Sequence, residues 1–155
     1  MRVTAKLSLV GPASVGGTEM RKDERDLLKV LKLELIFLEK GGYRGNHSSG
    51  LCRPYFIFED SPSCLNYGCF DYDCRGHRSP CTDCVLIDLV PPERRSERLP
   101  CRHIPFGGSG ETLDSLYRFC DQQEIEERVD SWLQATIERL EKEQRSRSEQ
   151  SVTRR

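Results

Sequence analysis

Apolar residues recur at helical spacing through the last third of the chain, and this pattern predicts an amphipathic helix. The apolar stripe consists of Ile125, Val129, Trp132, Leu133, Ile137 and Leu140. Residues three or four positions apart share one face of an α-helix, so the stripe should pack on the rest of the domain. Asp121 is a suitable N-cap, and Glu124 stands three residues later, as in a capping box. We therefore expect this helix to begin at Asp121.

Three shorter stretches have patterns that are typical of β-strands. In residues 31–37 apolar side chains alternate with charged ones over most of the stretch, which is the period of a half-buried strand. Residues 55–58 are short, aromatic and β-branched, which suits a strand buried on both faces. Residues 85–90 predict a third strand that two prolines end, although a buried helical turn would also fit them.

The fold class follows from these elements. Residues 99–106 and 112–119 flank a glycine-rich loop, and together they predict a β-hairpin. The expected fold is α+β, with a small, mostly antiparallel sheet on which the C-terminal amphipathic helix packs. We expect a single domain over residues 31–143, a poorly ordered lead at 1–30 and a disordered basic tail at 144–155.

Composition narrows the class of protein. The chain has 155 residues and a formal net charge of -1, which argues against a protein that coats nucleic acid. No apolar run approaches the roughly 20 residues that a membrane-spanning helix needs. Gly11 and Pro12 interrupt the apolar stretch near the N-terminus before it reaches the length of a secretory signal, and Met20 is an alternative start. We expect a cytoplasmic protein whose partner is another protein, and no pattern indicates its oligomeric state.

The eight cysteines indicate a metal site. Thiols in the cytoplasm stay reduced, and clustered reduced cysteines usually bind a metal ion. Cys81 and Cys84 have the two-residue gap that lets neighbouring thiolates bind one zinc ion. Sixteen residues separate Cys64 from Cys81, and sixteen separate Cys84 from Cys101. We predict a structural zinc ion that staples the cysteine-rich loop and is bound by Cys64, Cys81, Cys84 and Cys101.

Other ligand sets remain open. Cys69 could complete a set with Cys64 and the Cys-x2-Cys pair, and His103 could take the place of Cys101. Cys74 is a further candidate in the same loop as Cys69. That loop is rich in glycine and charge, so it offers its thiols less rigid support than the predicted strand ends do. This difference favours the preferred set.

Several motifs together carry a resemblance to known proteins. They are Cys64-Leu65-Asn66-Tyr67, the Cys-x2-Cys pair, Val90-Pro91-Pro92-Glu93, Pro100-Cys101-Arg102-His103-Ile104-Pro105, the segment from Glu111 to Arg118, and the helix with Trp132-Leu133 and Thr136 to Leu140. Over about residues 31–141 the chain resembles a group of short uncharacterised bacterial proteins. It departs from them by extra residues around 69–77. The resemblance implies a bacterial origin and a recurrent domain, and it implies no activity.

The sequence contains no recognisable catalytic constellation, so our first hypothesis is a zinc-stabilised binding or adaptor module without catalysis. The alternative is a thiol oxidoreductase in which Cys81 attacks and Cys84 resolves the mixed disulfide. The strand-like residues after Cys84 count against it, because a redox dithiol of this type opens a helix. A zinc hydrolase would use His103 as a ligand with Asp88 or Glu93 as the base, and it needs an open position on the metal.

Overall fold

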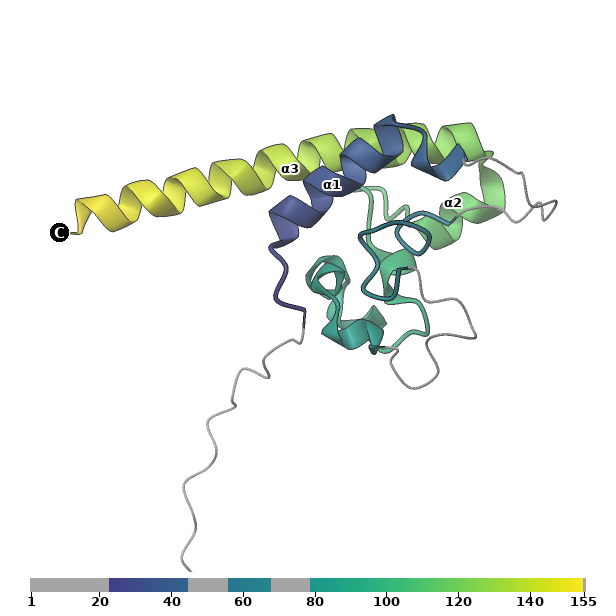
Figure 1. Cartoon of the computed structure of the whole chain (residues 1–155), viewed down its shortest axis with the longest axis horizontal. Helices are drawn as coiled ribbons and strands as arrows, with labels where there is room; N and C mark the ends of the chain where they lie inside the picture. The colour runs from purple at the N-terminus through teal and green to yellow at the C-terminus, as the bar shows by residue number, and fades with distance from the viewer. Residues whose placement is uncertain (1–22, 45–55, 68–78, 155) are drawn as a thin grey trace, which may run out of the picture.

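The described part of the chain is built from helices and tight turns. The computed structural model describes residues 23–44, 56–67 and 79–154 (Figure 1). Three α-helices lie in these ranges: α1 (Leu27–Glu39), α2 (Leu113–Phe119) and α3 (Gln122–Thr153). Short 3-10 turns connect α1 to α2: η1 (Gly42–Arg44), η2 (Cys81–Asp83), η3 (Val85–Leu89), η4 (Pro92–Arg94) and η5 (Pro100–His103).

The expected α+β fold with an antiparallel sheet is wrong. Within the described ranges the only β-type pairing is an isolated antiparallel bridge between Pro105 and Thr112. The bridge lies where the hairpin was predicted, but α2 begins immediately after it. Thr112 caps α2, since its side chain accepts a hydrogen bond from the Ser115 N–H at 3.3 Å while the Ser115 hydroxyl accepts from the Thr112 N–H at 2.9 Å.

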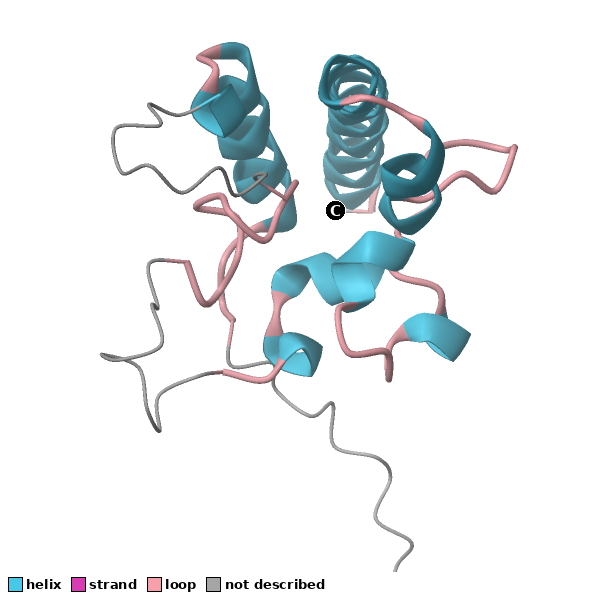
Figure 2. Cartoon of the chain, turned by 90° about the vertical axis from the view of Figure 1, so that its right-hand side faces the viewer, coloured by secondary structure: helices cyan, strands magenta, loops and turns pink. Residues whose placement is uncertain are grey.

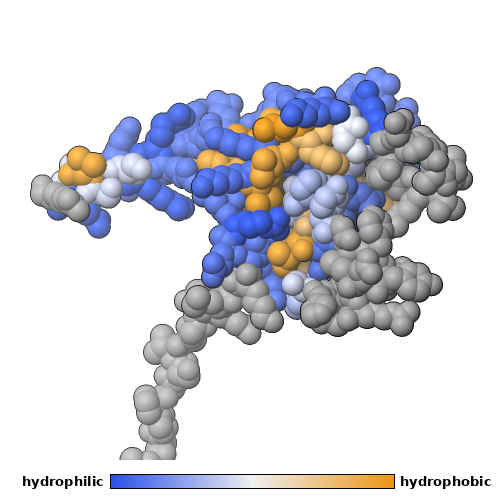
Figure 3. All heavy atoms as spheres, in the orientation of Figure 1, coloured by the Kyte–Doolittle hydropathy of each residue, from blue (hydrophilic) through white to orange (hydrophobic). Residues whose placement is uncertain are grey.

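The predicted strand at residues 31–37 is the middle of α1. The segment is apolar at so many positions that it satisfies a period of two and a helical period at once. Leucine, lysine and glutamate are good helix formers, and Asp26 caps the helix by accepting a hydrogen bond from the Lys29 N–H at 3.2 Å. The helix then buries Leu31 and Leu38 in the core and leaves Leu33 exposed. Figure 3 shows hydrophobic residues at the surface in the region of α1.

The other two predicted strands are turns. Val85, Leu86 and Ile87 are all buried in η3, so neighbouring residues point into the core instead of alternating across a sheet. This is the helical turn that the sequence also allowed. In the second segment, Phe58 has a φ of 64°, which is incompatible with a strand. That backbone conformation costs on the order of 1–2 kcal/mol for a non-glycine residue, and the complete burial of the Phe58 ring offsets it.

The prediction for α3 is confirmed at its N-terminus. The Asp121 side chain accepts a hydrogen bond from the Glu124 N–H at 2.9 Å, and the Glu124 side chain accepts one from the Asp121 N–H at 3.0 Å. At its other end α3 continues to Thr153, through residues where the sequence predicted a disordered tail. Figure 1 shows these last turns projecting beyond α1, and the described side chains from residue 142 onward are exposed.

The core lies where α1 and α3 meet the turns. Figure 2 shows the two helices side by side with the short turns beneath them. The predicted stripe of α3 faces this core, because its members Ile125, Val129, Leu133 and Ile137 are buried. The Trp132 ring packs edge-on against Phe58 and Phe106, with ring centroids 6.1 and 4.9 Å apart. None of the described helices combines the length and the apolar character needed to cross a membrane.

A buried carboxylate joins α1 to the turn that precedes Cys64. Glu34 is 1% exposed and accepts hydrogen bonds from the hydroxyls of Tyr43, Ser61 and Ser63, with the Ser61 bond at 2.6 Å. The Tyr43 hydroxyl in turn accepts a hydrogen bond from the Phe58 N–H at 2.9 Å. Burial raises the pKa of Tyr43, so its hydroxyl keeps its proton and remains a donor. The network holds the turn over residues 58–63 against α1.

Candidate cysteine site

The four cysteines of the preferred set line one cavity. Cys64, Cys81, Cys84 and Cys101 come from three separate turns, and they surround a space of about 30 Å³. The remaining lining residues are Leu65, Asn66, Leu86, Ile87, Val90 and Pro100. A space of this size accommodates one water-sized occupant. Four cysteines line this space, and thiolate sulfur is the soft donor that zinc prefers.

Tight turns present these cysteines. Cys81 opens η2, and the Cys84 N–H donates to the Cys81 carbonyl at 3.1 Å, so the two-residue gap forms a closed knuckle. Cys64 ends another turn, in which its N–H donates to the Ser61 carbonyl at 3.0 Å. Cys101 is the second residue of η5, which begins at Pro100. Each thiol therefore projects from backbone that hydrogen bonds or a proline ring hold in place.

Backbone N–H groups also point at two of the sulfur atoms. The N–H of Asn66 acts to lower the pKa of Cys64, and the N–H groups of Leu86 and Leu65 act to lower that of Cys84, although burial outweighs both effects. Donors of this kind stabilise a thiolate, because they stabilise negative charge on sulfur.

Burial nevertheless dominates the protonation of the thiols. It raises the pKa of Cys64, Cys84 and Cys101, and for Cys64 and Cys101 the neighbouring thiol groups raise the pKa further. A thiolate costs more in a poorly hydrated cavity than in water, and several thiolates repel one another. These three thiols are therefore protonated at neutral pH unless a cation joins them.

A reciprocal amide pair fixes the distance between two of the turns. The Asn66 side-chain N–H donates to the Ser79 carbonyl, and the Ser79 N–H donates to the Asn66 side-chain oxygen, both at 2.9 Å. Asn66 follows Cys64 by two residues, and Ser79 precedes Cys81 by two. The pair therefore holds the Cys64 turn beside the Cys-x2-Cys knuckle.

Arg102 anchors the fourth cysteine. Its guanidinium binds both carboxylate oxygens of Glu59, at 2.7 and 3.2 Å, and lies over the rings of Phe56 and Tyr117. The paired contacts with Glu59 raise the pKa of Arg102, which therefore stays charged. Because Arg102 follows Cys101 directly, these contacts set the position of η5 against the turn at residues 56–60.

The expectation of a ready-made zinc centre is wrong. Over the ranges 23–44, 56–67 and 79–154, no three or more His, Cys, Asp or Glu side chains are placed so that they could hold a metal ion. The four thiols share the cavity wall with six other side chains and pack there as small apolar groups. Without a bound cation, no interaction favours the close approach of four neutral thiols to one point.

The alternative ligands and bases lie apart from this cavity. His103 is in η5 but does not line the space, and Cys120 is the C-cap of α2. Asp88 and Glu93, considered as bases for a zinc hydrolase, are exposed and do not line it either. Cys69 and Cys74, considered as alternative ligands, lie outside the described residues, and so does Cys52.

Two charged residues that the sequence assigned to the lead pack against the cysteine turns. The Arg25 guanidinium donates to the carbonyls of Pro62 and Ser63 at 3.2 and 3.0 Å. The Asp23 carboxylate accepts from the Val85 N–H at 2.9 Å and from Arg25 at 2.7 Å. These contacts span from 37 to 62 residues of sequence, and no local pattern in a run of mixed charges predicts them.

Comparison with protein-family models, curated proteins and solved structures found no match to this chain. The resemblance to short bacterial proteins therefore stays a prediction. The geometry of the cysteine cavity is the observation from which function has to be argued.

Proposed function

We propose that the chain is a non-catalytic binding module whose cysteine cavity takes up one zinc ion. The observation that supports this proposal is the shared cavity itself: thiols from residues 64, 81, 84 and 101 surround a space for one atom. Binding would require the four side chains to turn toward a common point. The four residues line the same cavity, and rotation about their Cα–Cβ bonds is the change that we propose.

The chemistry of uptake follows from the protonation of the thiols. Cysteines bind zinc as thiolates, so an entering ion displaces protons from the buried thiols. The N–H groups directed at the sulfur atoms of Cys64 and Cys84 then stabilise the charge that develops there. Structural zinc sites contribute on the order of 10–16 kcal/mol in small peptides, and this is largely folding free energy. A region held mainly by short turns would gain most from it.

The same cavity argues against catalysis. Four thiolates would close the coordination of a zinc ion, whereas a hydrolytic zinc needs an open position for water. In the oxidoreductase alternative Cys84 is the resolving thiol, and burial raises its pKa, which leaves less of the thiolate that must attack the mixed disulfide. Cys81 and Cys84 also lead into 3-10 turns and not into an α-helix. The binding module is therefore the better supported proposal.

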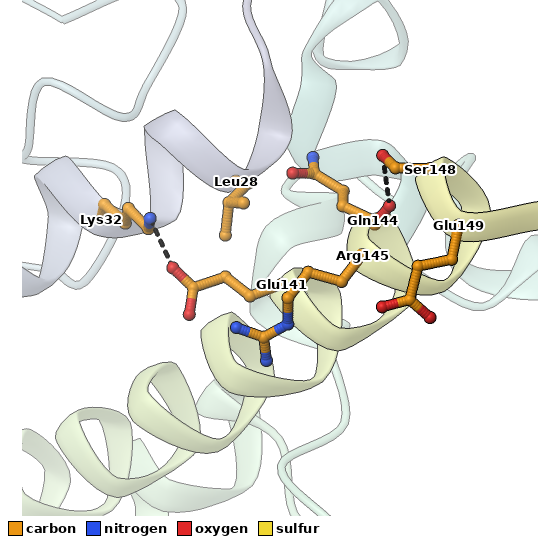
Figure 4. A pocket seen from close by; sticks show the side chains of 7 residues that line it. All are labelled: Leu28, Lys32, Glu141, Gln144, Arg145, Ser148 and Glu149. Carbon is orange, nitrogen blue, oxygen red and sulfur yellow. Dashed lines mark hydrogen bonds and ion pairs between the residues drawn. The ribbon is translucent and has the colours of Figure 1, made fainter. Parts of the chain in front are cut away.

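We propose a protein as the partner. The projecting turns of α3 and the start of α1 form an open hollow of about 500 Å³ (Figure 4). Its wall carries both signs of charge, including Arg145 and Glu149, and the ion pair of Lys32 with Glu141 crosses it. A surface of mixed charge suits a polar protein surface better than a nucleic acid, which favours concentrated positive charge.

Cobalt titration under reducing conditions tests the proposal, because Co²⁺ replaces zinc and its absorption reports thiolate ligands. We expect one equivalent per chain with thiolate-to-metal charge transfer and a tetrahedral spectrum. Cys101→Ser should weaken binding or alter the spectrum. Cys120→Ser is the matched control, because this cysteine does not line the cavity, and it should bind as the wild type does. Absence of the charge-transfer band in the wild type would refute the proposal, and so would equal behaviour of the two variants.

A further inference from the structure

The pair Asp23–Arg25 connects the two halves of the cysteine site. Arg25 donates to the carbonyls of Pro62 and Ser63, which immediately precede Cys64. Asp23 accepts from the N–H of Val85, which immediately follows Cys84. Each partner of one ion pair thus holds one of the turns that carry cysteines.

The pair is itself rigid. Two nitrogen atoms of the Arg25 guanidinium donate to the two oxygens of Asp23, at 2.8 and 2.7 Å, and the Asp23 side chain is 1% exposed. A bidentate pair of this kind fixes the plane of both groups and leaves little freedom for either. This pair therefore sets the separation of the Cys64 and Cys84 turns together with the Asn66–Ser79 pair.

The guanidinium also lies close enough to the thiols to interact with their charge. Contact with Asp23 is the main cause that raises the pKa of Arg25, and the charges of Cys84 and Cys64 contribute to it. A zinc ion with four thiolates has a net charge of about -2, which is costly in a poorly hydrated site. A fixed cation beside two of the sulfur atoms offsets part of this cost.

We propose that Arg25 is a positioning residue of the cysteine site, which holds the Cys64 and Cys84 turns at the separation that one ion can bridge and offsets the charge of the bound thiolates. This inference rests on the proposed zinc uptake and extends it to residues outside the cavity. It also connects the site to the helices, since Arg25 directly precedes Asp26, the N-cap of α1.

Metal affinity of matched arginine variants tests the inference. Partners that support metal ligands from outside typically contribute 10–100-fold to affinity, so Arg25→Gln should weaken Co²⁺ and Zn²⁺ binding by about that factor. The stoichiometry and the tetrahedral cobalt spectrum should stay unchanged. Arg25→Lys keeps the charge but loses the planar fork, and it should recover part of the affinity. Arg95→Gln is the control, because Arg95 also donates to a carbonyl of a turn, that of Val90 at 2.9 Å, but does not bridge two cysteine turns.

Three results would overturn the inference. One is wild-type affinity in Arg25→Gln, and another is an equal loss of affinity in Arg95→Gln. The third is no recovery in Arg25→Lys when both variants fold. Should Arg25→Gln fail to fold, Asp23→Asn serves in its place, and wild-type affinity in that variant would overturn the inference. Failure of zinc uptake itself is distinguishable, since the wild type would then bind no cobalt.

Discussion

The buried carboxylate of Glu34 offers a test of how α1 is held in the fold. Glu34→Ala removes the acceptor of three hydroxyl donors, of which those of Ser61 and Ser63 lie in the turn before Cys64. Each buried donor left without a partner costs about 1–3 kcal/mol. The serine hydroxyls can turn to other acceptors, as Ser61 already does toward the Phe58 carbonyl at 3.2 Å, so the lower part of this range applies to them.

These contributions add up to a loss of about 3–5 kcal/mol in the free energy of unfolding. Such a loss is a large part of the roughly 5–15 kcal/mol that stabilises a typical domain. Denaturant unfolding of the wild type and Glu34→Ala, followed by circular dichroism, measures it directly. Tyr43→Phe removes one donor and also leaves the Phe58 N–H without its acceptor, so we expect a smaller loss of about 1–3 kcal/mol.

Glu39→Ala is the matched control, because Glu39 lies on the same helix and is exposed. Its free energy of unfolding should stay within about 0.5 kcal/mol of the wild-type value. If Glu34→Ala were as stable as Glu39→Ala, the Glu34 carboxylate would not be the buried acceptor that the structure shows. The conclusion that Glu34 holds the turn over residues 58–63 against α1 would then be wrong as well.

Two further predictions concern the core and the response to acid. Trp132→Ala should cost about 3–5 kcal/mol in unfolding free energy, because the ring packs on Phe58 and Phe106, whereas Phe119→Ala should change little because Phe119 is 85% exposed. Equal melting temperatures of the two variants would contradict this packing. Although burial raises the pKa of Asp23, its hydrogen bonds with Arg25 and Val85 hold the pKa at about 2, below the ordinary value of 3.8. The contribution of Asp23 to stability is therefore present above about pH 4 and lost as the pH falls toward 2. Asp23→Asn should flatten the pH dependence of the unfolding free energy in that window. An unchanged pH dependence would contradict the lowered pKa of Asp23.

Some features of the chain follow from local sequence alone. The start of α3 depends on Asp121 and Glu124, whose mutual hydrogen bonds close within three residues, so the pattern and the structure agree. The apolar stripe of α3 could also be predicted from the sequence. Charged residues occupy the other faces of the helix, so only the helical period fits the apolar positions. Of the four cysteines that line the cavity, only the proximity of Cys81 and Cys84 follows from local spacing, since one tight turn spans the two residues between them.

Other features were decided only by tertiary contacts. Residues 31–37 satisfy two periods, and the local cap at Asp26 selects the helix together with the packing of α1 against α3, which no pattern in the segment shows. The φ of Phe58 depends on burial of its ring and not on any turn motif. Arg25 reaches carbonyls 37 and 38 residues away, and nothing in a run of mixed charges distinguishes it from a solvated side chain. Capping and periodicity act over one or two turns of chain and can be read from sequence, whereas burial, ion pairing and the approach of distant turns depend on which surfaces meet in three dimensions.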